Sequence, residues 1–311
     1  MAPSCFNFLK EGFLLPSRNR RLFTAVCALI LVSTTLLVLG NDLAVQPLTD
    51  EIKLDLKALS TTEPGSPDYA KIVQDIHNDA KELLLVIMGY ILVVVVVGSA
   101  VRIVVLFAAV LTYSGEQRTT TFGALLGQAK VQIKGPLLTL AFVYVLEIVY
   151  VVLVVAMAVL LGVLMAKQYF VVLFIGSLLV LAALVCLVYF SFLCSFSLVV
   201  AVAEPGCYGA GALGRACKLV KGKKWQVVLY VAVTVALAGI ISPVRTLATI
   251  CAGNSVALGL LLDFVYAVLL ALVQLFAVCA MTAFYYERRE NSDSQLGAGG
   301  YAKLSTGEAS A

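Results

Sequence analysis

Long apolar segments alternate with short polar ones along this chain, and they dominate its pattern. From Leu137 to Ala203 the sequence holds one acidic residue, Glu147, and one basic residue, Lys167. An apolar run of about 20 residues crosses the hydrocarbon core of a bilayer as an α-helix. Runs of this kind predict six transmembrane helices, at residues 22–40, 83–111, 137–166, 170–203, 225–250 and 257–286.

The pattern inside these runs separates helices from the strands of a membrane barrel. Barrel strands alternate polar and apolar residues, whereas the runs here are apolar throughout. Helices also satisfy their own backbone hydrogen bonds in lipid. With 61% hydrophobic residues and a mean hydropathy of +1.01, a chain of 311 residues has more apolar surface than it can bury inside itself. The predicted fold class is therefore all-α, a polytopic membrane protein with six transmembrane helices.

The basic residues predict the orientation, because Lys and Arg gather on the cytosolic side of short loops. With a cytosolic N-terminus, the inner segments hold fifteen of the 22 basic residues and the outer segments hold five. We therefore expect both termini in the cytosol, with residues 1–21 as a basic tail and residues 287–311 as a disordered polar tail. The first run also resembles a signal peptide, so its cleavage remains an alternative to a retained anchor.

The outer segment from residue 41 to residue 82 is the only sizeable polar piece between spans, and it is acidic. Its pattern predicts two short helices separated by a break, the second running straight into the second span. We interpret it as a lid on the membrane surface, with a ligand-binding surface as the alternative.

Two inner connections, residues 123–135 and 210–222, resemble each other. In an alignment without gaps, five identities recur: Leu126, Gly127, Ala129, Lys134 and Gly135 fall on Leu213, Gly214, Ala216, Lys221 and Gly222. Each connection is expected to be a short amphipathic helix that ends at a Lys-Gly cap. This predicts a parallel internal repeat, with spans two and three matching spans four and five.

The same connections carry basic residues that can reach lipid headgroups while their apolar neighbours dip into the membrane. We expect anionic headgroups as partners there, and simple determination of topology is the alternative. The residues concerned are Lys130, Lys134, Arg215, Lys218, Lys221, Lys223 and Lys224.

Three motifs resemble a plant family of uncharacterised six-span membrane proteins. They are Pro16-Ser-Arg-Asn-Arg-Arg21 before the first span, Leu111-Thr-Tyr-Ser-Gly115 after the second, and Ala203-Glu-Pro-Gly206 followed by Gly209 and Lys221-Gly222. The resemblance covers about residues 10 to 290, and Cys217 stands where such relatives often have Ser. It implies the six-span architecture and no particular activity.

Four charged residues lie inside the predicted spans, where a charge is costly and is a functional candidate. Counting about 1.5 Å per residue along the helices places Arg102 and Glu147 at matching depth. The same count places Arg245 near Asp263. We therefore predict two intramembrane ion pairs, which either join helices or line a pathway. Pro243 is expected to kink the fifth span beside Arg245.

Signals for catalysis and cofactors are weak. The sequence has one histidine, His77, which excludes sites that need several histidines, and it has no C-x-x-C pair among eight cysteines. Walker A loops and G-x-S-x-G elbows do not occur. We expect no enzymatic activity, no cofactor or metal, and no nucleic-acid partner.

The sequence as a whole predicts a non-enzymatic integral membrane protein that organises lipids or partner proteins of unknown identity. The alternative is a small-solute transporter or channel built on the repeat. The long spans favour a thick bilayer, which indicates the plasma membrane or late endomembranes.

Overall fold

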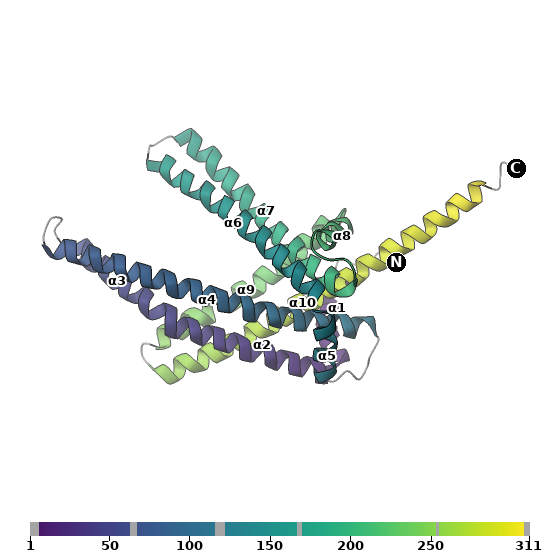
Figure 1. Cartoon of the computed structure of the whole chain (residues 1–311), viewed down its shortest axis with the longest axis horizontal. Coiled ribbons are helices and arrows are strands. Elements are labelled where there is room, and N and C mark those ends of the chain that lie inside the picture. The colour runs from purple at the N-terminus through teal and green to yellow at the C-terminus, as the bar shows by residue number, and fades with distance from the viewer. Residues whose placement is uncertain (1–5, 63–66, 116–121, 167–169, 253–254, 308–311) are drawn as a thin grey trace. The chain divides into compact units, whose positions relative to one another are not determined.

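Every element formed by the described residues is helical in the computed structural model of the chain (Figure 1). The structure describes residues 6–62, 67–115, 122–166, 170–252 and 255–307. The elements are α1 (Asn7–Arg18), α2 (Arg20–Gly40), the π-helix η1 (Asn41–Val45), α3 (Gln46–Thr61), α4 (Pro67–Ser114), α5 (Phe122–Gln132), α6 (Lys134–Ala166), α7 (Phe170–Ala203), α8 (Ala210–Val220), α9 (Lys224–Ala252) and α10 (Val256–Gly307).

Six segments of the described chain are long and apolar enough to cross a membrane. The first comprises α2, η1 and α3, and the others lie within α4, α6, α7, α9 and α10. The six predicted spans fall within α2, α4, α6, α7, α9 and α10, and α7 has the predicted bounds. This confirms the fold class, an all-α membrane protein with six spanning helices. A continuous apolar run stays helical in lipid, because its backbone groups have only each other as hydrogen-bond partners.

The outer segment is more helical than the sequence suggested. The first span was expected to end at Gly40, but η1 and α3 continue the helix to Thr61. Pro47 does not interrupt it, because proline is tolerated in the first turn of α3, where its missing N–H is not needed. The second predicted helix does run straight into the second span, as α4 begins at Pro67.

The terminal segments also differ from the expected tails. Residues 7–18 form α1, whose Phe8 and Leu15 are fully buried. Helix α10 continues to Gly307, beyond the predicted end of the last span at Tyr286, and the disorder expected from residue 287 stays a prediction. Extending an existing helix needs no new nucleation, and Arg288 Nε anchors its first turn by donating to the Leu219 carbonyl oxygen at 3.1 Å.

The order long helix, short helix, long helix occurs twice, as α4–α5–α6 and as α7–α8–α9. The predicted Lys-Gly cap is present at α8, where Lys221 is the cap and Gly222 has φ +88°. It is absent at α5, because α6 already begins at Lys134 and takes Gly135 into its first turn. Gly135 instead leaves room for the Tyr208 ring, which a Cβ atom would hit.

The chain divides into two compact units. Unit 1 comprises residues 1–24, 103–239 and 273–311, and unit 2 comprises residues 25–102 and 240–272. The core of unit 1 is apolar and lies where the ends of α4, α7 and α10 meet α1 and α8. Its largest fully buried side chains include Phe8, Leu15, Phe107, Phe196, Leu198, Val199, Val200 and Tyr285.

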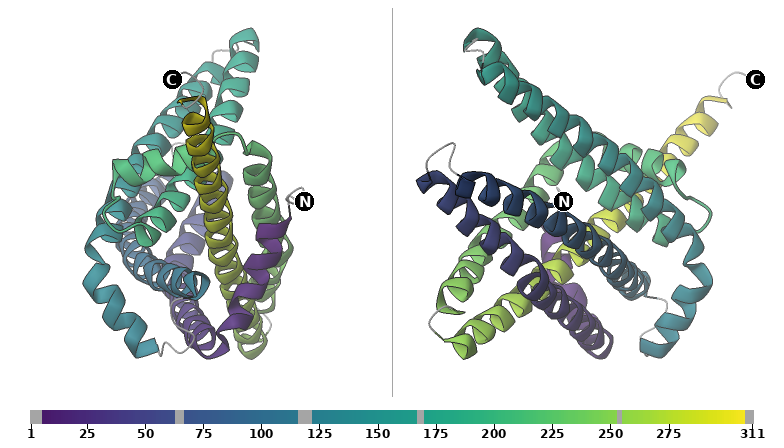
Figure 2. Two further views of the ribbon diagram at one scale, coloured as in Figure 1. Left: turned by 90° about the vertical axis from the view of Figure 1, so that its right-hand side faces the viewer. Right: turned by 60° about the vertical axis from the view of Figure 1, so that its left-hand side comes forward.

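Within unit 1, α6 and α7 run side by side as an antiparallel hairpin, drawn in teal in Figures 1 and 2. Only 6% of the most apolar window of α6 is buried inside the chain, against 33% for α4. Val149, Val152 and Leu160 are among the many large apolar side chains of α6 that remain exposed. Such a surface is stable against lipid and not against water.

Candidate functional site

A charged cluster in unit 2 joins three helical segments. Arg245 of α9 donates through Nη2 to Asp42 Oδ1 of η1 at 2.5 Å. Its Nη1 lies 3.7 Å from Asp263 Oδ1 of α10, so the two residues predicted to pair are neighbours. The guanidinium also lies over the Tyr266 ring, 5.7 Å from its centroid. The Arg245 guanidinium therefore forms ion pairs with two carboxylates. We call Asp42, Arg245 and Asp263 the Asp-Arg-Asp cluster.

Two irregularities of the helices coincide with this cluster. Asp42 lies in the π-helical segment Asn41–Val45, and Pro243 lies inside α9 two residues before Arg245. A π-turn and a proline both free backbone groups from the regular helical pattern, and π-segments are frequent at functional sites. The kink predicted at Pro243 stays a prediction. In the sequence, Asp42 belongs to the acidic outer segment, and its contact with Arg245 was not predicted. Its position as the first acidic residue after the first span was the available signal.

The other predicted intramembrane residues lie in different units. Glu147 of α6 accepts a hydrogen bond from Ser191 Oγ of α7 at 3.2 Å, within unit 1. This contact links the two helices of the hairpin. Arg102 of α4 belongs to unit 2, so its pairing with Glu147 stays a prediction from the sequence.

Helix α8 presents a basic surface. Its buried face consists of Ala212, Ala216, Leu219 and Val220. Lys218, Lys221 and Lys224 are exposed, while Arg215 and Lys223 are half-buried. Trp225 follows directly and is 84% exposed. We call Lys218, Lys221, Lys224 and Trp225 the α8 basic face.

The first connection offers a smaller version of this surface. Lys130 of α5 and Lys134 at the start of α6 are both exposed. In α5, Leu125 and Ala129 are buried one helical turn apart, whereas Val131 is 80% exposed. This connection has no tryptophan, since the single Trp of the sequence is Trp225. It also has no counterpart of Lys223 and Lys224.

A partly buried polar network holds α8 in place, and it was not predicted from the sequence. Glu204, at the end of α7, accepts a hydrogen bond from Tyr285 of α10 at 2.8 Å and lies 3.4 Å from Arg215 Nε of α8. Arg288 of α10 donates to the Leu219 carbonyl oxygen of α8. Glu204 stands in the Ala203-Glu-Pro-Gly206 motif, so its place directly after an apolar span was the available signal.

The motif Leu111–Gly115 also has a structural role in unit 1. The Tyr113 ring stacks on the Tyr286 ring of α10, with centroids 4.5 Å apart. The Arg18 guanidinium of α1 lies 5.8 Å from the Tyr113 ring centroid. Cation–π and stacked aromatic contacts contribute on the order of 0.5–1.5 kcal/mol each. The motif therefore links the ends of α1, α4 and α10.

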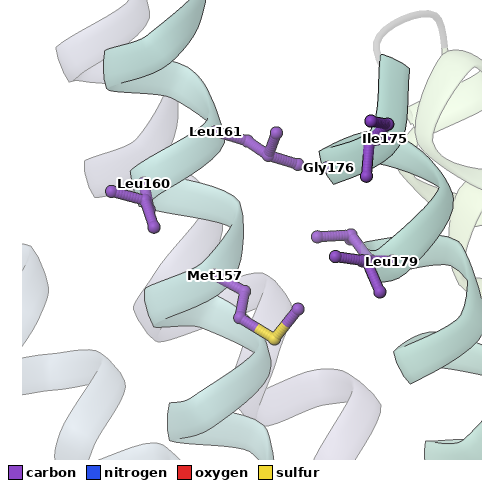
Figure 3. Close-up of a pocket in the computed structure, with 7 residues that line it drawn as sticks. Met157, Leu160, Leu161, Ile175, Gly176 and Leu179 are labelled. Carbon is purple, nitrogen blue, oxygen red and sulfur yellow. The ribbon is translucent and has the colours of Figure 1, made fainter. Parts of the chain in front are cut away.

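An apolar pocket of about 280 Å³ opens between the outer parts of α6 and α7 (Figure 3). Met157, Leu160 and Leu161 line it from α6, and Ile175, Gly176 and Leu179 line it from α7. It has no charged or hydrogen-bonding side chain among its lining residues. Such a pocket accommodates methyl groups or an acyl chain and has no polar group to orient a solute.

The described residues contain no group of three or more His, Cys, Asp or Glu side chains that could hold a metal ion. The chain belongs to the family described as a domain of unknown function (DUF8558), whose model matches residues 3–292. No curated protein and no solved structure matches it. The class that fold and family define is thus a six-helix membrane protein of the DUF8558 family.

Proposed function

We propose that this protein is a non-enzymatic membrane organiser that binds anionic lipid headgroups through the α8 basic face. The observation that carries this proposal is the exposure of Trp225, whose side chain is 84% exposed and which follows the exposed Lys221 and Lys224 in the chain. Tryptophan prefers the headgroup level of a bilayer, and lysine stems extend to phosphate and carboxylate groups. The opposite side of α8 is buried, so the basic face is the side of this helix that a partner can reach.

Rigid attachment of α8 supports the proposal. Glu204, Tyr285 and Arg288 connect α8 to α7 and α10. Leu219 and Val220 pack into the apolar core of unit 1. A basic helix that is held in one position binds headgroups without the entropic cost of ordering a flexible segment. The closely packed core of unit 1 also favours an organising role over a solute pathway through that unit.

The orientation that we propose places both termini and α8 in the cytosol, where anionic lipids are abundant. Its support is the distribution of Lys and Arg between inner and outer segments. We also propose the plasma membrane or late endomembranes as its location, from the lengths of the spans. The resemblance to six-span plant proteins supports a plant origin for the family.

The single tryptophan allows a direct test. The protein is reconstituted into vesicles that contain either brominated phosphatidylserine or brominated phosphatidylcholine, and Trp225 fluorescence is measured. We expect stronger quenching by the anionic lipid. Each basic residue near the surface contributes about 1 kcal/mol, so Lys218→Gln, Lys221→Gln and Lys224→Gln together should remove most of the preference.

A charge-matched control uses three lysines of the acidic outer segment. Lys53→Gln, Lys57→Gln and Lys71→Gln change the net charge equally and should leave the quenching preference unchanged. Equal quenching by the two lipids in the unmodified protein would overturn the proposed headgroup site. An equal loss of the preference for the anionic lipid in both triple variants would also overturn it.

A small-solute transporter or channel is the second candidate function. The Asp-Arg-Asp cluster favours it, because charged residues at helix irregularities mark solute and ion paths in transporters. Solute flux into vesicles that contain the purified protein tests this alternative. Flux that disappears in Arg245→Gln and persists in the α8 triple variant would favour transport over organisation.

A further inference from the structure

We infer that the Asp-Arg-Asp cluster is a proton-binding site and that Asp263 is the carboxyl group that takes up the proton. The inference is independent of the headgroup proposal, since the cluster lies in unit 2 and α8 lies in unit 1. It rests on charge balance, on the unequal contacts of the two carboxylates and on the position of Arg245 and Asp263 within spanning helices.

The charges of the cluster do not balance when all three groups are ionised. Two carboxylates and one guanidinium leave one negative charge, and the side chains are only 20–23% exposed. An uncompensated charge among spanning helices is costly, and taking up one proton removes it. The remaining exposure gives a proton a way in and out.

The contacts assign the proton to Asp263. Asp42 Oδ1 accepts one hydrogen bond from Arg245 Nη2 at 2.5 Å and a second from Asn41 Nδ2 at 3.3 Å. Asp263 Oδ1 is buried and has no hydrogen-bond donor among the described residues. Its distance of 3.7 Å from Arg245 Nη1 exceeds a hydrogen bond. Asp263 therefore gains less from ionisation than Asp42 does.

Titratable, charged or aromatic groups from four helical segments lie around the cluster in unit 2. Asp42 comes from η1, Arg245 from α9 and Tyr266 from α10. α4 contributes the phenol of Tyr90, whose hydroxyl donates to the Leu37 carbonyl oxygen at 2.9 Å. Among these described groups Arg245 is the one cation. Its single positive charge therefore compensates only one of the two carboxylate charges.

Dicyclohexylcarbodiimide, which modifies protonated carboxyl groups in apolar surroundings, provides the test. The full-length protein in vesicles is treated at several pH values, and the modified residues are mapped by mass spectrometry. We expect the reagent to modify Asp263 and not Asp42, and the reactivity of Asp263 to fall as the pH rises. Asp42→Asn removes the competing carboxylate, so that Arg245 pairs with Asp263 alone and stabilises its ionised, unreactive form. The modification of Asp263 should then slow about tenfold or more.

Asp50→Asn is the matched control, because Asp50 is exposed on α3 and pairs with Lys53. It should not alter the rate at Asp263. Infrared difference spectra between acidic and alkaline pH give a second readout, in which Asp263→Asn should remove one carboxylic C=O band. The inference is overturned if Asp42 is modified in place of Asp263, if Asp42→Asn leaves the rate unchanged, or if no band depends on Asp263.

Discussion

Single small residues determine how closely the helices of unit 1 approach one another. Phe8, Gly12 and Leu15 form the buried stripe of α1, spaced at four and three residues. A Cβ atom at Gly12 would lie 2.5 Å from Ala280 Cα of α10, closer than side chains ever approach a backbone. The edge-on contact of Phe8 with Phe284, at 5.5 Å between centroids, depends on the same approach. Small residues at helix contacts are a general means of packing in membranes.

Replacing Gly12→Ala should therefore separate α1 from α10. Overpacking of this kind costs about 1–3 kcal/mol, so the thermal unfolding midpoint in detergent should fall. Gly214→Ala is the matched control, because Gly214 is exposed on α8 and a Cβ atom there meets nothing within 4 Å. Equal midpoints for the two variants would contradict close packing of α1 on α10.

At the scale of elements, α8 is positioned by polar groups at the ends of other helices. Glu204 of α7 contacts both Tyr285 of α10 and Arg215 of α8. At the other end of α8, Gly222 adopts φ +88°, and Lys223 N–H bonds to the Val220 carbonyl oxygen at 3.1 Å. A glycine in the left-handed region ends a helix at no steric cost. The chain then enters α9 at Lys224 with the basic face outward.

A double-mutant cycle tests this network. Glu204→Ala and Tyr285→Phe each remove one side of a buried hydrogen bond, and each should lower the free energy of unfolding by about 1–3 kcal/mol. Because the two groups are in contact, their effects should be non-additive by about 0.5–3 kcal/mol. Tyr230→Phe serves as the comparison, since its hydroxyl donates to the Ala277 carbonyl oxygen and not to Glu204. Additive effects of Glu204→Ala and Tyr285→Phe would show that the hydrogen bond contributes nothing.

At the scale of the whole molecule, an even number of spans places both ends of the chain on one side of the membrane. In the orientation that we propose from the positive-inside rule, that side is the cytosol and residues 41–82 lie on the other side. The sequence contains no N-x-[ST] acceptor, so a single introduced acceptor reports its own side without background.

Ala58→Asn places an acceptor in the outer segment, and Lys303→Asn places one in the C-terminal segment. When each variant is synthesised into microsomal membranes, we expect Ala58→Asn to gain one glycan and Lys303→Asn to gain none. Electrophoretic mobility before and after endoglycosidase treatment measures the outcome. Glycosylation of the Lys303→Asn variant alone would reverse the proposed orientation.

The sequence by itself determined the fold class and the position of the six spans, because lipid exposure requires uninterrupted apolar helices whatever their neighbours. It also placed Arg245 and Asp263 at matching depth, since depth follows from the rise per residue. Polar segments carry no such constraint. The continuity of α3 with the first span through η1, and the helical part of α10 after Tyr286, therefore escaped prediction, although a short helix in the region of α3 was expected.

Only the tertiary structure decided which residues meet from distant parts of the chain. The contact of Asp42 with Arg245, the network around Glu204 and the packing of Gly12 on Ala280 depend on how helices are rotated about their axes. Helices that are apolar on all sides carry no amphipathic stripe, so their sequence does not record which face is turned inward. The rotation of each helix determines which charged groups meet. It therefore determines the sites proposed for headgroups and for a proton.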